Sequence, residues 1–308
     1  MTPSSKLKCV RDPDIIVLAA GGVLGEAWMN GVLAGLSDGG VDVESAHAYV
    51  GTSAGSIVAA RMVSGHGPRQ PPSAADPRDE DVFADDSAAR RATATALSAM
   101  GTIAQPLAGA LLSTTAPAGA LARAAVLSRL PRNGTALHDV HARVERWGAE
   151  FDGRLLVCAV DRRSGRRVVF GAPGSPRTTV ADAVQASCSI PAIFDPVRIG
   201  DRDYVDGGAW SLTNLDVAPA RSGDHVLCLS VAANSRRSIG SPIGAMFRGF
   251  DAASGLEAAA VRSRGATVQR VGPDRAVARA LGPSLMDPRP RDEVHAGGHR
   301  QGLALAAR

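Results

Sequence analysis

The stretch IIVLAAGGVLGEAWMNGVLAGL, residues 15–36, decides the fold class, because a strand-like run leads through glycines into a helix-like segment. Ile15–Ala20 has the length and unbroken apolar character of a strand buried in a parallel sheet. Gly21 and Gly22 follow at once and favour a tight turn. Over 28–36 the apolar residues recur at helical spacing. The stretch therefore predicts a buried strand, a glycine turn and a helix.

The same order of elements repeats in the residues that follow. Ala46–Val50 is a second short apolar run, Gly51 comes directly after it, and Ala54–Val63 has the composition of a helix. Two successive strand–turn–helix units are typical of an α/β protein with a mostly parallel sheet. Further strands are expected over 155–160, 168–170, 198–205 and 225–231, with a helix over 181–186. We therefore predict a three-layer α/β/α fold with a mostly parallel central sheet.

Changes of composition divide the chain into one main domain and its flanking segments. Residues 1–13 are expected to form a flexible leader, and residues 14–281 a single domain. Within that domain, 66–92 is rich in proline and acidic residues and predicts an acidic mobile loop, while the Ala/Leu-rich 93–150 predicts a helical insert. The Gly-, Pro- and Arg-rich residues 282–308 are expected to form a tail.

The overall composition excludes several classes of protein. The chain has 308 residues and a net charge of +4, and its basic residues are spread out, so no nucleic-acid partner is expected. The four cysteines lie far apart without a C-x-x-C pair, which argues against a disulfide framework or zinc ribbon and fits a reducing compartment. No apolar run approaches the roughly 20 residues that span a bilayer, and no secretory signal is recognisable. We expect a cytoplasmic protein.

The pentapeptide GTSAG, residues 51–55, has the pattern G-x-S-x-G and lies between the second predicted strand and its helix. A nucleophilic serine needs such a turn, because small neighbours let the backbone bend sharply and let a substrate carbonyl approach. At the start of a helix, Ser53 also lies at the positive end of the helix dipole, which favours a developing oxyanion. Taken alone, the pattern fits a plain glycine-rich turn equally well.

The residue best suited to activate Ser53 is an aspartate rather than a histidine. None of the seven histidines has a sequence setting that would hold it rigidly beside the serine. Asp206, in the segment YVDGG (residues 204–208), follows a predicted strand and precedes two glycines that would let two loops approach closely. An Asp-Gly pair is by itself also the commonest sign of an ordinary β-turn.

Four blocks in one order make the chain similar to the patatin-like phospholipase family. The first is the glycine-rich loop AGGVLG (20–25), and the second is GTSAG (51–55). The third, ASCSIPAIFDP (186–196), resembles the family segment A-S-x-x-x-P-x-x-F-x-P, and the fourth is YVDGG (204–208). The resemblance covers approximately residues 14–235.

The resemblance implies a serine acyl hydrolase with a Ser/Asp dyad, in which Ser53 matches the nucleophile and Asp206 the general base. The oxyanion hole corresponds to the backbone N–H groups of Gly21, Gly22 and Val23. The other motif positions are Gly25, Gly51, Gly55, Gly207 and Gly208. The implied reaction is hydrolysis of carboxylic esters in phospholipids or lysophospholipids through an acyl-enzyme, without a cofactor or a metal.

Three features depart from the common family pattern. Ala20 stands in place of the first of three glycines, and Leu24 in place of a basic residue after the loop. The following helix is one residue longer, with residues 28–30 in place of small residues and a histidine. Loss of the basic residue weakens the local positive field but leaves the backbone donors, so we expect it to affect rate and head-group preference more than activity itself.

Two other interpretations of the same residues stay open. Ala20-x-Gly22-x-x-Gly25 also resembles an incomplete dinucleotide-binding fingerprint, in which Asp42 or Glu44 would bind the ribose. That interpretation makes the serine and the aspartate of the dyad incidental. The chain could also be a non-catalytic lipid-binding relative that kept the fold. The intact dyad argues against this interpretation, whereas the leucine at the basic position favours it.

A lipid ester substrate implies transient contact with a membrane surface, so the cytoplasmic enzyme is expected to be peripheral there. The Ala/Leu-rich residues 93–130, broken by prolines, fit either a mobile lid beside a lipid pocket or ordinary core helices. Trp28 and Trp210 are expected in the core or a pocket wall. His138-x-x-His141 lacks the acidic residue usual between zinc-binding histidines and is expected on an exposed helix surface.

Overall fold

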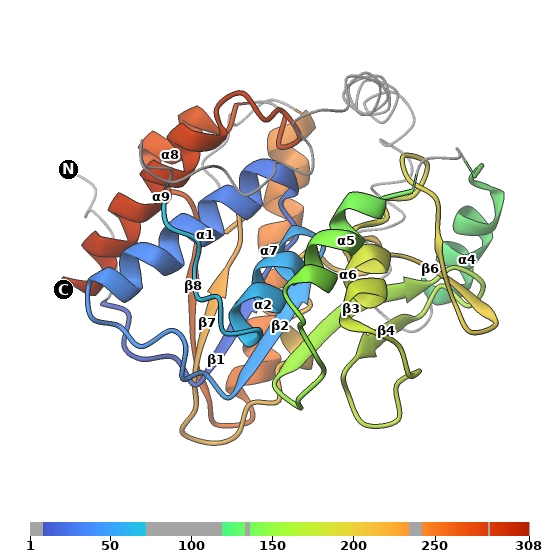
Figure 1. The fold of residues 1–308 in the computed structure, drawn as a ribbon, viewed down its shortest axis with the longest axis horizontal. Coiled ribbons are helices and arrows are strands. Elements are labelled where there is room, and N and C mark those ends of the chain that lie inside the picture. Colours follow the sequence, from blue (N-terminus) through green and yellow to red (C-terminus); the bar gives the residue numbers. More distant parts are fainter. Residues whose placement is uncertain (1–8, 72–118, 133–135, 234–241, 283, 308) are drawn as a thin grey trace.

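The computed structural model describes residues 9–71, 119–132, 136–233, 242–282 and 284–307 (Figure 1). Four predicted segments lie partly outside these residues: 1–8 of the leader, 72–92 of the acidic loop, 93–118 and 133–135 of the helical insert, and 283 and 308 of the tail. Within the described part of the chain, no helix is long and apolar enough to cross a bilayer.

A mostly parallel sheet forms the centre of the fold (Figure 1). Its strands in the described residues are β1 (Ile15–Leu18), β2 (Ala48–Thr52), β3 (Leu155–Asp161), β4 (Arg167–Phe170), β5 (Val197–Ile199), β6 (Arg202–Asp206), β7 (His225–Leu229) and β8 (Thr267–Val271). Strands β3, β2, β1, β7 and β8 run parallel in this order. Strands β4 and β6 pair antiparallel with β3, and β5 pairs antiparallel with β6. The predicted mostly parallel sheet is confirmed.

Helices cover both faces of this sheet (Figure 1). The described ones are α1 (Gly22–Asp38), α2 (Ala54–Val63), α4 (Ala120–Arg129), α5 (His138–Arg146), α6 (Val180–Cys188), α7 (Pro242–Arg262), α8 (Arg275–Ala280) and α9 (Arg291–Ala306). Alternate side chains of β1 point to opposite faces: Ile16 and Leu18 share a core with α1, α2, α5, α6 and α9. Ile15 and Val17 share a second core with α7. The predicted three-layer arrangement is therefore confirmed.

The register around β3 brings the carboxyl ends of two strands together. Thr52, the last residue of β2, pairs with Cys158, and Asp206, the last residue of β6, pairs with Ala159. Strand β4 pairs with β3 along both of these stretches, so β2 and β6 must share the other edge of β3. The two strands therefore lie end to end and run toward each other. The residues that follow Thr52 meet the residues that follow Asp206.

The end of the chain differs from the predicted tail. Residues 291–306 form α9, which packs against α1 (Figure 1). A Cβ on Gly35 would lie 2.0 Å from the carbonyl oxygen of His299, and one on Gly302 would lie 2.3 Å from that of Val32. The glycines that suggested a loose tail instead let two helix backbones approach each other closely. The expectation of a tail is therefore wrong for this helix.

Residues 242–271 hold a long helix and a strand, neither of which is among the elements expected from the sequence. Helix α7 has 21 residues and covers the second face of the sheet. Strand β8 pairs in parallel with β7 at the edge of the sheet. Most of β8 is partly exposed, so its sequence TVQRV lacks the unbroken apolar character of a buried strand.

Candidate active site

Ser53 lies in the sharp turn between β2 and α2, as the G-x-S-x-G pattern predicts. Its φ of 52° and ψ of −125° are rare for a residue with a side chain. A Cβ on Gly55 would lie 2.0 Å from the carbonyl oxygen of Leu18, and one on Gly51 would lie 2.4 Å from Cα of Ser56. The turn can be this tight only because both positions lack a side chain. It presents Ser53 at the N-terminus of α2, where the dipole favours negative charge.

The hydroxyl of Ser187 holds this turn where the chain leaves the sheet. In the ladder, the N–H of Tyr49 donates to the carbonyl of Arg154 at 2.8 Å, so the same register would direct the N–H of Ser53 to the carbonyl of Cys158. Instead, Ser187 Oγ accepts from the N–H of Ser53 at 2.8 Å and donates to that carbonyl at 2.7 Å. The end of α6 therefore replaces one ladder bond and fixes the position of Ser53.

Asp206 lies at the carboxyl end of β6, buried beside the serine turn. Its N–H donates to the carbonyl of Ser189 at 2.9 Å, and its Oδ1 accepts from the N–H of Gly208 at 2.6 Å. Burial raises the pKa of Asp206 from 3.8 to about 6, although hydrogen bonding from the Ser53 hydroxyl and from Gly208 acts to lower it. The carboxylate therefore lies beside the serine turn and has the pKa of a base that works near neutral pH.

The chain can turn directly after Asp206 because Gly207 has no side chain. A Cβ on Gly207 would lie 2.3 Å from the carbonyl oxygen of Cys158 and 3.2 Å from Cγ2 of Thr52. A larger residue would therefore push β6 away from the end of β2. A Cβ on Gly208 would lie 2.9 Å from Oδ1 of Asp206 itself, so the second glycine also keeps space around the carboxylate.

The glycine-rich loop begins α1 at the carboxyl end of β1. Gly22 has a φ of 61°, in the left-handed region that favours glycine. Among the described residues, the N–H groups of Gly21, Gly22 and Val23 have no hydrogen-bond acceptor, whereas the N–H of Leu24 donates to the carbonyl of Leu285 at 3.0 Å. Unpaired N–H groups at the start of a helix are suited to bind an oxyanion.

Close backbone contacts bring the three motif loops together. A Cβ on Gly55 would lie 2.8 Å from the carbonyl oxygen of Ala19, which places the serine turn against the chain entering the glycine-rich loop. A Cβ on Gly208 would lie 3.7 Å from the Cβ of Ala20, which places that loop beside the turn after Asp206. The carboxyl ends of β1, β2 and β6 thus gather a serine, a carboxylate and a row of N–H donors. This set of groups is suited to acyl transfer.

The segment that precedes α9 covers the start of α1. Leu24, which stands where the family resemblance expects a basic residue, is fully buried in the core. A Cβ on Gly22 would lie 2.7 Å from Sδ of Met286 and 2.8 Å from the carbonyl oxygen of Leu285. Leu285 and Met286, expected to belong to a tail, therefore pack directly on the glycine-rich loop.

Helix α4, the described part of the expected lid, is docked against the turn after Asp206. Buried Arg123 of α4 donates from Nε to the carbonyl of Ala209 at 3.1 Å and from Nη1 to that of Gly165 at 2.5 Å. Its guanidinium carbon also lies 4.3 Å from the ring centre of Trp210. Trp210 therefore packs against α4.

The dinucleotide-binding interpretation fails on the placement of its acidic residues. Asp42 and Glu44 precede β2 and lie at the amino end of the sheet. The glycine-rich loop follows β1, which runs parallel to β2, so this loop lies at the opposite, carboxyl end. A ribose ligand must reach a nucleotide bound on the glycine-rich loop, and neither carboxylate is at that end of the sheet.

Histidines are not part of this arrangement: in the described ranges, none hydrogen-bonds to Ser53 or Asp206. His295, expected in a loose tail, is buried within α9. Its Nε2 lies 2.9 Å from the carbonyl oxygen of Arg69, and burial lowers its pKa to about 4. It is therefore a neutral side chain that joins two parts of the core.

Several residues around the site have contacts that the sequence does not indicate. Ser187 and Ser189 belong to the block ASCSIPAIFDP, whose pattern marks the segment but does not say what the serines bond. Asn214 lies buried in the loop after Asp206. Nothing in the sequence distinguished it, because a single asparagine in a turn-like segment has many uses.

The family model for "Patatin-like phospholipase" matches residues 16–219 of this chain. The solved structure of VipD from Legionella pneumophila is 14% identical with a TM-score of 0.42, and the match covers 100% of this chain and 72% of VipD. The type III effector protein ExoU is 16% identical with a TM-score of 0.38, over 97% of this chain and 54% of ExoU. Because the family match spans both Ser53 and Asp206 and more than half of the sequence, the chain belongs to the patatin-like phospholipase family.

Proposed function

We propose that this protein hydrolyses carboxylic ester bonds of phospholipids or lysophospholipids through an acyl-enzyme on Ser53, with Asp206 as the base. The observation that carries the proposal is the placement of Ser53, in a strained turn at the end of β2, beside the end of β6 and its buried carboxyl, whose pKa is raised to about 6. Membership of a family of phospholipases supports the lipid substrate. We expect the protein to contact a membrane surface transiently, because its lipid substrate is located there.

The first half of the reaction transfers the acyl group to the enzyme. Ser53 Oγ attacks the ester carbonyl carbon while its proton passes to Asp206, and the negative charge that forms on the carbonyl oxygen meets the N–H groups of Gly21, Gly22 and Val23. The tetrahedral intermediate then expels the alcohol, which takes the proton from Asp206. The product of this half is an acyl ester of Ser53 and the free alcohol, such as a lysophospholipid or a glycerol phosphodiester.

The second half hydrolyses the acyl-enzyme. Asp206 accepts a proton from water, and the resulting hydroxide attacks the acyl carbonyl carbon. Collapse of the second tetrahedral intermediate returns the proton to Ser53 Oγ and releases the fatty acid. With a pKa of about 6, roughly nine tenths of Asp206 is ionised at pH 7, so the base is ready near neutral pH without a histidine.

Hydrolysis of separate lipid classes by four proteins tests the proposal. The wild type, Ser53→Ala, Asp206→Asn and the control Ser64→Ala are incubated with micelles of phosphatidylcholine, lysophosphatidylcholine or triacylglycerol, and released fatty acid is measured by mass spectrometry. Ser64 lies at the far end of α2, where its hydroxyl donates to the carbonyl of Arg61 at 2.8 Å. Ser64→Ala therefore also removes a serine hydroxyl of α2 but leaves the candidate site intact.

The wild type and the control should release fatty acid from at least one phospholipid class. Ser53→Ala and Asp206→Asn should be about 10²–10⁴-fold slower, the usual contribution of a positioned base or nucleophile. Equal release by all four proteins would show that the dyad assignment is wrong. Release from triacylglycerol alone would keep the dyad but contradict the phospholipid assignment, and no release from any lipid would favour a non-catalytic lipid-binding protein.

A further inference from the structure

Asn214 has an unusual backbone conformation in the loop that follows Asp206. Its φ of 46° and ψ of 33° lie in the left-handed region, and the residue is fully buried. Among the described residues, only two other non-glycine residues have a positive φ, Ser53 and Ala192. Asparagine tolerates this region better than most residues, yet a buried residue held there is maintained by its surroundings. The contacts of its side chain show what holds it.

The side-chain amide nitrogen of Asn214 bonds to both segments that carry the proposed dyad. Nδ2 donates to Oγ1 of Thr52 at 3.0 Å and to the carbonyl of Ser211 at 2.7 Å, with the carbonyl of Gly207 at 3.5 Å. Thr52 directly precedes Ser53, and Gly207 directly follows Asp206. One nitrogen atom thus contacts the residue before the serine and the residue after the aspartate.

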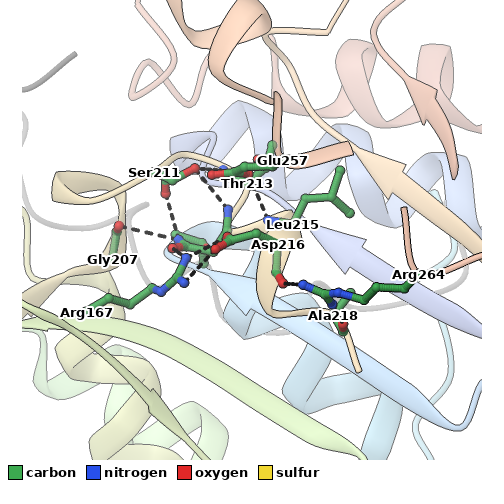
Figure 2. A network of polar contacts seen from close by, with 11 residues as sticks. Arg167, Gly207, Ser211, Thr213, Leu215, Asp216, Ala218, Glu257 and Arg264 are labelled. Atoms are coloured by element: carbon green, nitrogen blue, oxygen red, sulfur yellow. Dashed lines mark hydrogen bonds and ion pairs between the residues drawn. The ribbon is translucent and has the colours of Figure 1, made fainter. Parts of the chain in front are cut away.

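The orientation of this amide is determined by an arginine. Nη1 of Arg167 donates to Oδ1 of Asn214 at 3.1 Å, and a guanidinium can only donate, so the oxygen must face it and the NH₂ group must face Thr52. Arg167 is held in turn by two hydrogen bonds of 2.7 Å to the Asp216 carboxylate (Figure 2). Its guanidinium carbon also lies 5.3 Å from the ring centre of Trp210. The amide therefore cannot flip without losing the Arg167 bond.

Both neighbours of Asn214 are fixed from α7. The carboxylate of Glu257 accepts from the hydroxyl of Thr213 and, at 2.9 Å, from the N–H of Leu215 (Figure 2). The N–H of Asn214 itself donates to Oγ of Ser211 at 3.1 Å. The loop is therefore a rigid support, anchored on one side to α7 and on the other to Arg167.

The geometry of the sheet explains why such a support is needed. Strands β2 and β6 meet end to end along one edge of β3, so no ladder of hydrogen bonds joins them to each other. The distance between Ser53 and Asp206 depends on the turns that follow the two strands. Ser187 in α6 and Ser189 directly after it hold these turns, one bond to each. Asn214 is the side chain that contacts both segments through a single atom.

We propose that Asn214 is a positioning residue, which keeps the serine turn and the aspartate turn at the separation that proton transfer requires. The inference rests on the proposed function, since positioning matters only if Ser53 and Asp206 react together. Its effect is on the chemical step rather than on substrate binding, because Asn214 is buried behind the two turns and bonds to neither Ser53 nor Asp206.

Two substitutions remove the same hydrogen bond from opposite sides. Thr52→Val removes the acceptor with almost no change of shape, and Asn214→Gly removes the donor while keeping a residue that adopts the left-handed region freely. Thr52→Ser restores a hydroxyl and is the conservative rescue. Tyr49→Phe is the matched control, because it removes a buried hydroxyl that donates to the carbonyl of Val43 at 2.8 Å, at the other end of β2.

Hydrolysis of a soluble p-nitrophenyl ester is measured for these variants and for the Thr52→Val/Asn214→Gly double variant, with folding checked by circular dichroism. We expect kcat to fall about tenfold to a hundredfold in each single variant, as for a misplaced catalytic group, with KM little changed. The acid limb of the kcat/KM profile should move to higher pH, because weaker contact with Ser53 removes a hydrogen bond that lowers the pKa of Asp206. Thr52→Ser and Tyr49→Phe should keep the wild-type kcat and pH profile.

The double variant distinguishes positioning from general destabilisation. If both substitutions break the same bond, kcat of the double variant should be at most about twofold lower than kcat of the slower single variant. Unchanged kcat in folded Thr52→Val and Asn214→Gly, or fully additive losses, would overturn the inference even if hydrolysis depends on Ser53. Equal hydrolysis by the wild type and Ser53→Ala would instead overturn the proposed function, and the role of Asn214 would be rejected with it.

Discussion

Replacing Asp206 with asparagine should make the protein more stable at neutral pH although it removes the proposed base. Burial raises the pKa of Asp206 from 3.8 to about 6, a shift of about two units. Each unit corresponds to about 1.4 kcal/mol, so the ionised carboxylate costs the folded state about 3 kcal/mol. The asparagine side chain would keep an oxygen to accept from Gly208 and would carry no charge, so this cost would disappear.

The pH dependence of the effect follows from the direction of the shift. Between pH 3.8 and about 6 the folded protein holds a proton on Asp206 that the unfolded chain has released. The wild type therefore loses stability through Asp206 as the pH rises across this window. The cost is absent below the window and complete above it, and Asp206→Asn does not experience it at any pH.

Urea unfolding followed by circular dichroism from pH 4 to 7.5 measures this difference. Asp206→Asn should have nearly the wild-type free energy of unfolding at pH 4 and exceed it by about 3 kcal/mol at pH 7. Asp201→Asn, which removes an exposed carboxylate from the β5–β6 turn, controls for the loss of one negative charge. A difference that is independent of pH, or an asparagine variant less stable than the wild type at pH 7, would refute the reasoning.

Three further predictions concern packing, a buried ion pair and backbone strain. Gly35→Ala should destabilise the protein by about 1–3 kcal/mol in urea unfolding, since its Cβ would lie 2.0 Å from a backbone oxygen of α9. In the control Gly255→Ala, the nearest atom to the new Cβ is 4.0 Å away, so this variant should stabilise α7 by up to about 1 kcal/mol. Equal effects would contradict the packing of α9 on α1. Arg143→Met should lower the free energy of unfolding by about 3–5 kcal/mol at pH 7, because it leaves the buried carboxylate of Glu26 without its partner. In the wild type this carboxylate lies 3.0 Å from Arg143 Nη1. A smaller loss in the same unfolding assay would mean that the pair is solvated. Ser53→Gly should have a higher Tm than Ser53→Ala, because only glycine relieves a positive φ whose strain is about 1–3 kcal/mol; the opposite order would argue against the strained turn.

The sequence predicted those parts of the fold that depend on local patterns. Ile15–Ala20 and Ala46–Val50 were recognisable as buried strands, because a parallel strand covered on both faces must be apolar throughout. The glycines after them were recognisable because tight turns need them. The family resemblance then supplied the expectation of a Ser53–Asp206 pair, and the geometry at the end of β2 and β6 gives that expectation a physical basis.

The parts that the sequence did not predict depend on contacts between distant residues. Helix α9 is rich in glycine, a composition that resembles a loop until the close approach of α1 is known. Strand β8 is a partly exposed edge strand with mixed polarity, so periodicity does not mark it. The roles of Ser187 and Asn214 arise from hydrogen bonds to residues 134 and 162 positions away, which no local pattern encodes.

The most direct test of the account is whether Ser53 becomes covalently modified by a reagent that mimics an ester. The native protein is incubated with a fluorophosphonate, and the modified peptide is identified by mass spectrometry. The account predicts one adduct on Ser53 in the wild type, none in Ser53→Ala, and slower labelling in Asp206→Asn. A wild type that stays unmodified, or an equal adduct on Ser53→Ala, would contradict it.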